Sequence, residues 1–167
     1  DPADTHTTNF WEELASVELG SAGDTIDSGT ITAKKYLWIQ SFGIASGVID
    51  QLLQFNSDTG NNYTYRYSDN GTADGAGTTT NKTLFGAPTG AYNSFGNMFV
   101  INNSANEKLC IGNGVAQNTA GAETAPTRRE HVDKWTNTAS QITSVQIINQ
   151  GAGSFDTGSI LKVWGSD

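Results

Sequence analysis

Apolar and polar residues alternate along most of the chain, a pattern that indicates β-strands rather than helices. The run at 36–44, YLWIQSFGI, is almost continuously bulky and is typical of a central strand covered on much of both faces. A second apolar run at 48–56 and a tyrosine-rich alternation at 62–67 follow it across short turns. Further strands are expected at 10–19, 25–32, 97–102, 108–115, 131–136, 141–149 and near the C-terminal end.

The short spacing between these segments leaves no room for crossover helices. Roughly eight to ten strands therefore predict an all-β fold, an antiparallel two-sheet β-sandwich, with jelly-roll topology favoured. The polar residues 1–9 are expected to form an extended N-terminal arm, and 10–167 a single domain. Two long polar intervals, 68–96 and 116–130, read as loops that contact partners.

Composition excludes several partner classes. The chain has 9 Lys and Arg against 17 Asp and Glu, a net charge of −8. Such a chain is a poor match for a phosphate backbone or an anionic membrane surface, and no apolar run approaches the roughly 20 residues of a membrane span. Neither nucleic acid nor a membrane is expected as a partner. The lone Cys110 lies in a strand-like run and is expected to be a buried core thiol.

Five segments carry the patterns WEEL at 11–14, AKKYL at 33–37, LQFNSDTGNNY at 53–63, TRRE at 127–130, and GSI followed by VWG within 158–165. Together they resemble jelly-roll domains of tailed-phage virion structural proteins. The resemblance implies a non-enzymatic capsid decoration, spike or fibre-associated component at the virion surface. It also implies a homo-oligomer that contacts other virion proteins through its loops and N-terminal arm.

Carbohydrate-binding modules share the jelly-roll shape, so recognition of a host-surface glycan is the alternative function. Tyr63, Tyr65 and Tyr67 lie at period two and project from one face of a strand, where their rings could stack on a sugar. Cross-strand packing or an intersubunit contact is the other interpretation of the same pattern. The sequence leaves the two open.

Asp58, Asp69 and Asp74 lie among asparagines and offer the oxygen ligands that calcium prefers. Their spacing does not match an EF-hand loop, and Asp or Asn beside Gly first of all forms turns. No catalytic cofactor is expected. A structural calcium ion that stiffens a loop stays open beside simple turn formation.

Near the C-terminal third, Arg128 and Arg129 are expected to pair with acidic groups on a neighbouring subunit, with a salt bridge at the rim as the alternative. His131 and Asp133 follow, and with a serine they would supply the parts of a hydrolase triad. No nucleophile elbow of the form G-x-S-x-G accompanies them. No enzyme activity is therefore predicted.

Overall fold

The computed structural model describes residues 10–88 and 90–167, and over these ranges the chain forms β-strands and no helix. This confirms the all-β prediction, while the predicted arm at 1–9 falls outside the described residues. Over the same ranges no helix could cross a membrane. The strands are β1 (Glu12–Glu18), β2 (Thr25–Asp27), β3 (Tyr36–Gly43), β4 (Gln51–Phe55), β5 (Tyr63–Asp69), β6 (Gly75–Thr80), β7 (Thr83–Leu84), β8 (Ser94–Ile101), β9 (Lys108–Ala116), β10 (Thr127–Trp135), β11 (Val145–Asn149) and β12 (Ile160–Ser166).

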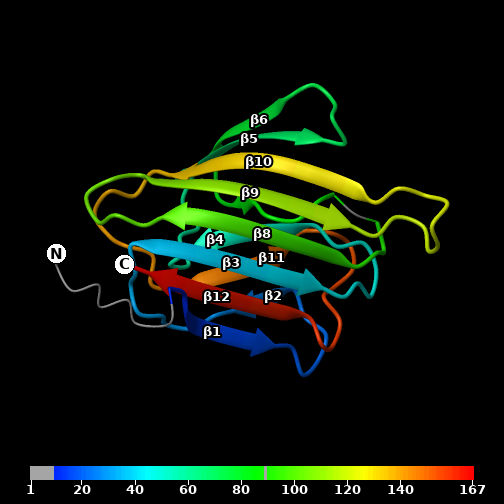
Figure 1. The fold of residues 1–167 in the computed structure, drawn as a ribbon, viewed down its shortest axis with the longest axis horizontal. Helices are drawn as coiled ribbons and strands as arrows, with labels where there is room; N and C mark the ends of the chain where they lie inside the picture. The colour runs from blue at the N-terminus through cyan, green and yellow to red at the C-terminus, as the bar shows by residue number, and fades with distance from the viewer. Residues whose placement is uncertain (1–9, 89) are drawn as a thin grey trace, which may run out of the picture.

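The strands form two antiparallel sheets that face each other. The larger has eight strands in the order β1-β12-β3-β8-β9-β10-β5-β6, and the smaller has four in the order β2-β11-β4-β7. Figure 1 shows β2, β4 and β11 lying behind the larger sheet. The predicted two-sheet β-sandwich is confirmed, and the jelly-roll topology stays a prediction.

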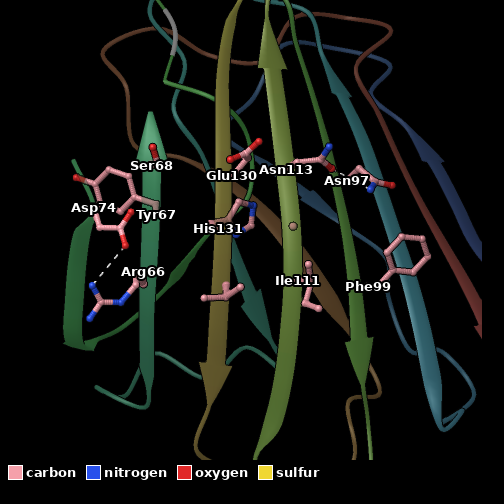
Figure 2. A pocket seen from close by; sticks show the side chains of 12 residues that line it. Arg66, Tyr67, Ser68, Asp74, Asn97, Phe99, Ile111, Asn113, Glu130 and His131 are labelled. Carbon is pink, nitrogen blue, oxygen red and sulfur yellow. Dashed lines mark hydrogen bonds and ion pairs between the residues drawn. The ribbon is translucent and has the colours of Figure 1, made fainter. Parts of the chain in front are cut away.

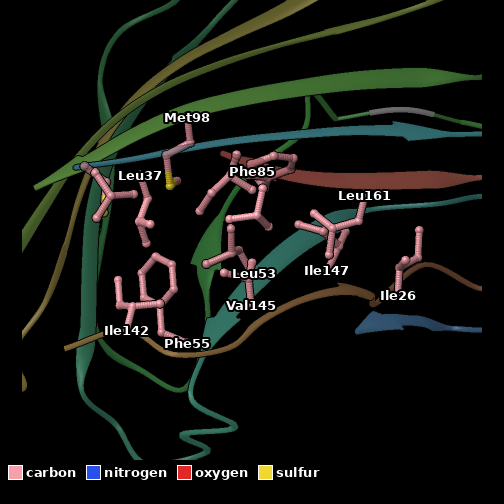
Figure 3. Close-up of a cluster of buried hydrophobic side chains, with 14 of the residues drawn as sticks. Ile26, Leu37, Leu53, Phe55, Phe85, Met98, Ile142, Val145, Ile147 and Leu161 are labelled. Carbon is pink, nitrogen blue, oxygen red and sulfur yellow. The ribbon is translucent and has the colours of Figure 1, made fainter. Parts of the chain in front are cut away.

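Apolar side chains from the inner faces of both sheets form the core. Figure 3 shows Leu37, Met98 and Leu161 of the larger sheet opposite Leu53 and Ile147 of the smaller one. Burial of such side chains is the main favourable contribution to folding. Cys110 lies in the same core, as predicted, and burial raises the pKa of its thiol well above the ordinary value.

The interval 68–96 is not one loop, because it contains β6, β7 and the first residues of β8. The sequence of β6, GAGTTT, does not show the alternation of a strand, because glycines occupy inward positions. A side chain on Gly75 or Gly77 would collide with the rings of Tyr67 and Tyr65. The predicted loop at 116–130 is also shorter, because β10 begins at Thr127. In the turn after β5, Asn70 and Gly71 have positive φ angles of 52° and 77°, the backbone shape that Asn-Gly pairs favour.

Candidate functional site

The inner side of β10 carries a buried polar network. Nδ1 of His131 lies 2.5 Å from an Asp133 carboxylate oxygen, and Nε2 lies 3.2 Å from the carbonyl oxygen of Phe85. The Thr83 hydroxyl donates to the other oxygen of Asp133. The side chains of His131 and Asp133 have no exposed surface. The hydroxyl therefore reaches the carboxylate and not the imidazole, and both ring nitrogens are occupied, an arrangement unlike a nucleophile activated by a histidine.

Arg129 lies on the same inner side, which corrects its predicted role in an interface. Its Nε and Nη2 donate to the two carboxylate oxygens of Asp69 at 2.8 and 3.0 Å, and its guanidinium lies 5.0 Å from the centre of the Tyr67 ring. Only 8% of the Arg129 side chain is exposed. The bidentate pair with Asp69 lies within the chain, so the Arg129 guanidinium is not available to bind a neighbouring subunit. Arg128 points outward and pairs with Glu130 at 2.6 Å.

The three tyrosines share the inner side of β5. Tyr63 is 1% exposed and stacks on Trp135 in the core, so its predicted contact with a sugar ring is wrong. Tyr65 and Tyr67 lie against each other, with ring centres 6.1 Å apart, over the glycines of β6. The structure thus brings the three residues together as cross-strand packing.

The three aspartates proposed for calcium are not brought together. Asp58 accepts hydrogen bonds from Trp135 Nε1 at 2.7 Å and from Asn62, before β5 begins. Asp69 ends β5 and holds Arg129, while Asp74 pairs with Arg66 at 3.7 Å. Across the described residues no group of three or more His, Cys, Asp or Glu is placed to hold a metal ion. Each of the three carboxylates instead has a partner in the protein.

Lys108 is a buried cation that sequence reasoning missed. Its ammonium donates to the carbonyl oxygens of Asn106 and Asn137, both at 2.8 Å, and lies over the Trp135 ring. Burial lowers the pKa of this lysine. Because both carbonyls come from loops at one end of the sandwich, we interpret Lys108 as a tie between loops rather than a reactive amine.

The side of the eight-stranded sheet that faces away from the smaller sheet, called here the outer face, is the most unusual surface. Strand register aligns its outward side chains into rows that run across the strands. The first apolar row consists of Trp164, Trp38, Phe99, Ile111 and Val132, and the second of Ile160, Phe42, Phe95 and Val115. Six of these nine side chains are exposed, up to 68% for Ile111 and 50% for Val132, and Trp164, Trp38 and Ile160 are half-buried.

A polar row separates the two apolar rows. It consists of Lys162, Gln40, Asn97, Asn113, Glu130 and Ser68. Asn97 joins two of its neighbours, because its Oδ1 accepts from Trp38 Nε1 at 2.5 Å and its Nδ2 donates to Asn113 Oδ1 at 3.1 Å. Figure 2 shows Asn97 and Asn113 pointing toward each other on neighbouring strands, above Phe99 and Ile111. The Trp38 indole and the Asn97 and Asn113 amides thus form a short hydrogen-bonded chain in the middle of the outer face.

The outer face also has several hollows, and two of them differ clearly in their lining. One, of about 550 Å³, runs over β5, β10, β9 and β8 and is lined by polar-row residues together with Phe99, Ile111 and Val132. The other is lined almost wholly by apolar groups, including Phe10, Trp11, Tyr36 and Leu109. Both are open and shallow. They offer holes for protruding side chains more than an enclosed cavity for a small molecule.

Each of the four cations on the outer face is balanced by a carboxylate. The cations Arg66, Arg128, Lys134 and Lys162 pair with Asp74, Glu130, Glu107 and Glu13 at 3.7, 2.6, 3.0 and 2.8 Å respectively. The chain as a whole carries a net charge of −8, so its excess of negative charge lies outside these pairs. The outer face is therefore nearly neutral on an acidic protein.

Comparison of the chain with protein-family models and with curated proteins finds no match. The function is therefore inferred from the geometry of the chain and from the resemblance noted in its sequence. The signal that could have revealed the outer face was present in the run at 36–44, which predicted a strand covered on both faces. β3 is central, yet Tyr36 and Phe42 on its outer side are exposed. Within residues 10–88 and 90–167, the chain covers only one of the two faces of this strand.

Proposed function

We propose that this chain is a non-enzymatic structural module of a larger protein assembly and that neighbouring protein covers its outer face. One observation carries the proposal: eight of the eleven exposed large apolar side chains in the described part of the chain lie on one sheet face, and only Phe10, Val48 and Tyr92 lie outside its strands. The members of this cluster on the outer face are Tyr36, Phe42, Phe95, Phe99, Leu109, Ile111, Val115 and Val132. Contiguous apolar surface of this kind is characteristic of interaction sites.

The chemistry of the most exposed members favours protein as the covering material. Ile111, Leu109 and Val132 are branched aliphatic residues and are at least half exposed. Such side chains present no flat ring to a sugar, and they interdigitate well with other side chains. Arg128 is exposed beside this surface, so the proposal includes it among the residues that contact the neighbouring protein.

The sequence resemblance to virion proteins supports a tailed-phage particle as the assembly. In that setting the rigid sandwich would serve as a decoration, spike or fibre-associated component at the particle surface. Its partners would be further copies of itself and other virion proteins. No cofactor is required for this role.

Thiol labelling of the assembly from its natural source tests the proposal. Val132→Cys places a thiol on the outer face, and Thr25→Cys places one on the exposed side of β2 as the control. The native Cys110 is buried and its thiol pKa is raised, so it contributes little background. With labelling normalised to the denatured chain, maleimide should modify V132C much more slowly than T25C in the assembly. Equal labelling of the two variants would overturn the proposal.

Glycan recognition is a second candidate, and the polar row is the observation that favours it. Asn97 and Asn113 offer amide donors and acceptors beside the exposed ring of Phe99, a combination suited to a sugar with hydroxyls and apolar C–H faces. A glycan array read with wild type, Phe99→Ala and Asn113→Ala tests it. Saturable binding lost in both variants supports this candidate, and an array without binding removes it.

A further inference from the structure

The two halves of the outer face are chemically different and complementary. The middle of the eight-stranded sheet lies between β8 and β9, with β1, β12, β3 and β8 on one side and β9, β10, β5 and β6 on the other. Large aromatic groups occupy the first half: Trp164, Trp38, Tyr36, Phe42, Phe95 and Phe99. Three of the four outer-face cations, Arg128, Lys134 and Arg66, lie in the second half, together with the aliphatic residues of β9 and β10. The fourth, Lys162, lies in the first half.

We infer that two copies of this chain pair face to face through their outer faces, about a two-fold axis that runs along the strands between β8 and β9. This inference rests on the proposed function and names the neighbouring protein as a second copy. A two-fold axis makes an isologous interface, in which each half of one surface meets the other half of its partner. Sheets that pack face to face keep their strands roughly aligned, as this axis requires.

The strand register, together with this axis, determines which side chains of the two copies would face each other. The axis places Phe99 of one copy over Ile111 of the other and, in the polar row, Asn97 over Asn113. Amides both donate and accept, so a row of them can hydrogen-bond to its own copy. Farther out, the axis brings Tyr36 over Lys134 and Phe42 over Arg128, pairs that suit cation–π contact.

Charge also favours a second copy over a strongly charged partner. With a net charge of −8, two copies repel each other wherever their acidic surfaces approach. On the outer face each of the four cations already has a carboxylate partner, so two such faces meet without net repulsion. An acidic or a basic partner would find no excess of opposite charge there.

Sedimentation equilibrium on variants with a charged residue on the outer face tests the dimer, because it gives the dimerisation constant of each variant. Wild type should be a dimer, while Phe99→Lys and Ile111→Glu should each weaken dimerisation by about 100-fold or more, because each buries a charge without a partner. Phe99 and Ile111 are exposed in the single chain, so both variants should keep the wild-type circular dichroism spectrum and melting temperature.

Mixing the variants tests the register itself. An equimolar mixture of Phe99→Lys and Ile111→Glu should recover the dimer, because the axis places the introduced ammonium over the introduced carboxylate. A mixture of Ile111→Lys and Ile111→Glu should stay monomeric, because position 111 faces position 99 and not itself. Recovery in the second mixture and not in the first would overturn this axis.

A wild-type chain that stays monomeric up to about 100 μM would overturn the dimer, since such weak association could not hold two copies together. That result is distinguishable from failure of the proposed function. If V132C is protected in the assembly while the isolated chain is monomeric, a different protein covers the outer face. If V132C is also freely labelled, both proposals fail.

Discussion

The two sides of β10 differ in a way that reverses the usual order of a sandwich. Its inner side carries Arg129, His131 and Asp133, whereas its outer side carries Val132 at 50% exposure. Each of these inner polar side chains of β10 has a partner within the chain. On the outer side, no other described residue covers the apolar side chain. Buried polar groups are tolerated only when they are paired, and exposed apolar clusters persist mainly where something else covers them. On β10, therefore, the inner polar groups are satisfied within the chain, whereas the outer apolar group is left exposed.

Loss of an inner charge should have the largest effect. Asp133→Ala leaves His131 Nδ1 and the Thr83 hydroxyl without their shared acceptor in a fully buried place. Breaking a buried pair in this way should lower the free energy of unfolding by about 3–5 kcal/mol. Urea denaturation measures it, with Asp133→Asn as a milder variant should the alanine variant not fold.

Glu130→Ala is the matched control on the outer side of the same strand. Its ion pair with Arg128 is exposed, with 63% of the Glu130 side chain in solvent. Exposed pairs contribute up to about 1 kcal/mol, so this variant should unfold close to wild type. Similar losses for Asp133→Ala and Glu130→Ala would mean that the inner network is not the stabilising side of the strand.

Steric crowding beneath the inner network should have the next largest effect. A methyl group on Gly112 of β9 would lie 2.2 Å from Cε1 of His131, and the ring is fixed at both nitrogens. Gly112→Ala should therefore destabilise by about 1–3 kcal/mol, as overpacking does. Gly20→Ala is the control, since a methyl group there meets nothing within 4 Å. A Gly112→Ala variant with a wild-type melting temperature would show that the His131 ring is free to move.

The inner polar network could not have been predicted from the sequence. In TRREHVDKW of β10, charged residues occupy both parities, so alternation does not say which side faces the core. The residues that satisfy the inner set are far away along the chain: Asp69 lies 60 positions from Arg129, and Thr83 lies 50 positions from Asp133. Only pairing of β10 with β5 and packing against β7 bring them close.

The sheet architecture was much more predictable, because strand alternation and short connections are local properties. The bulky run at 36–44 gave the central strand, and Asn-Gly at 70–71 forms the turn after β5. β6 was not predicted, because its glycines, threonines and single alanine give no alternation of large apolar residues. The outer face was present in the sequence as bulky residues at both parities of β3, but register across five strands was needed to align them into rows.

Acid should weaken one inner contact in a defined direction. Burial alone would raise the pKa of Asp58, but hydrogen bonds from Trp135, Asn62 and the Gly60 amide outweigh it and hold that pKa below its ordinary value of 3.8. A carboxyl whose pKa is lowered by folding stabilises the folded state at any pH above its ordinary pKa. This stabilisation is lost as the pH falls through the folded-state pKa. Wild type should thus be more stable than Asp58→Asn at neutral pH, and the difference should shrink below about pH 4. Denaturation series at several pH values measure it, and a difference independent of pH would contradict the assignment.

Substitution on the outer face should have the smallest effect on the single chain. Ile111→Thr removes apolar surface that is already 68% exposed, so with association suppressed by dilution the free energy of unfolding should change by about 0.5 kcal/mol or less. The same substitution at the buried Ile39 on β3 should cost about 2 kcal/mol or more, because it leaves a void and buries a hydroxyl. Equal losses at the two positions would mean that Ile111 already packs within its own chain. The apolar rows would then be part of the core, and the reason to seek a covering partner would disappear.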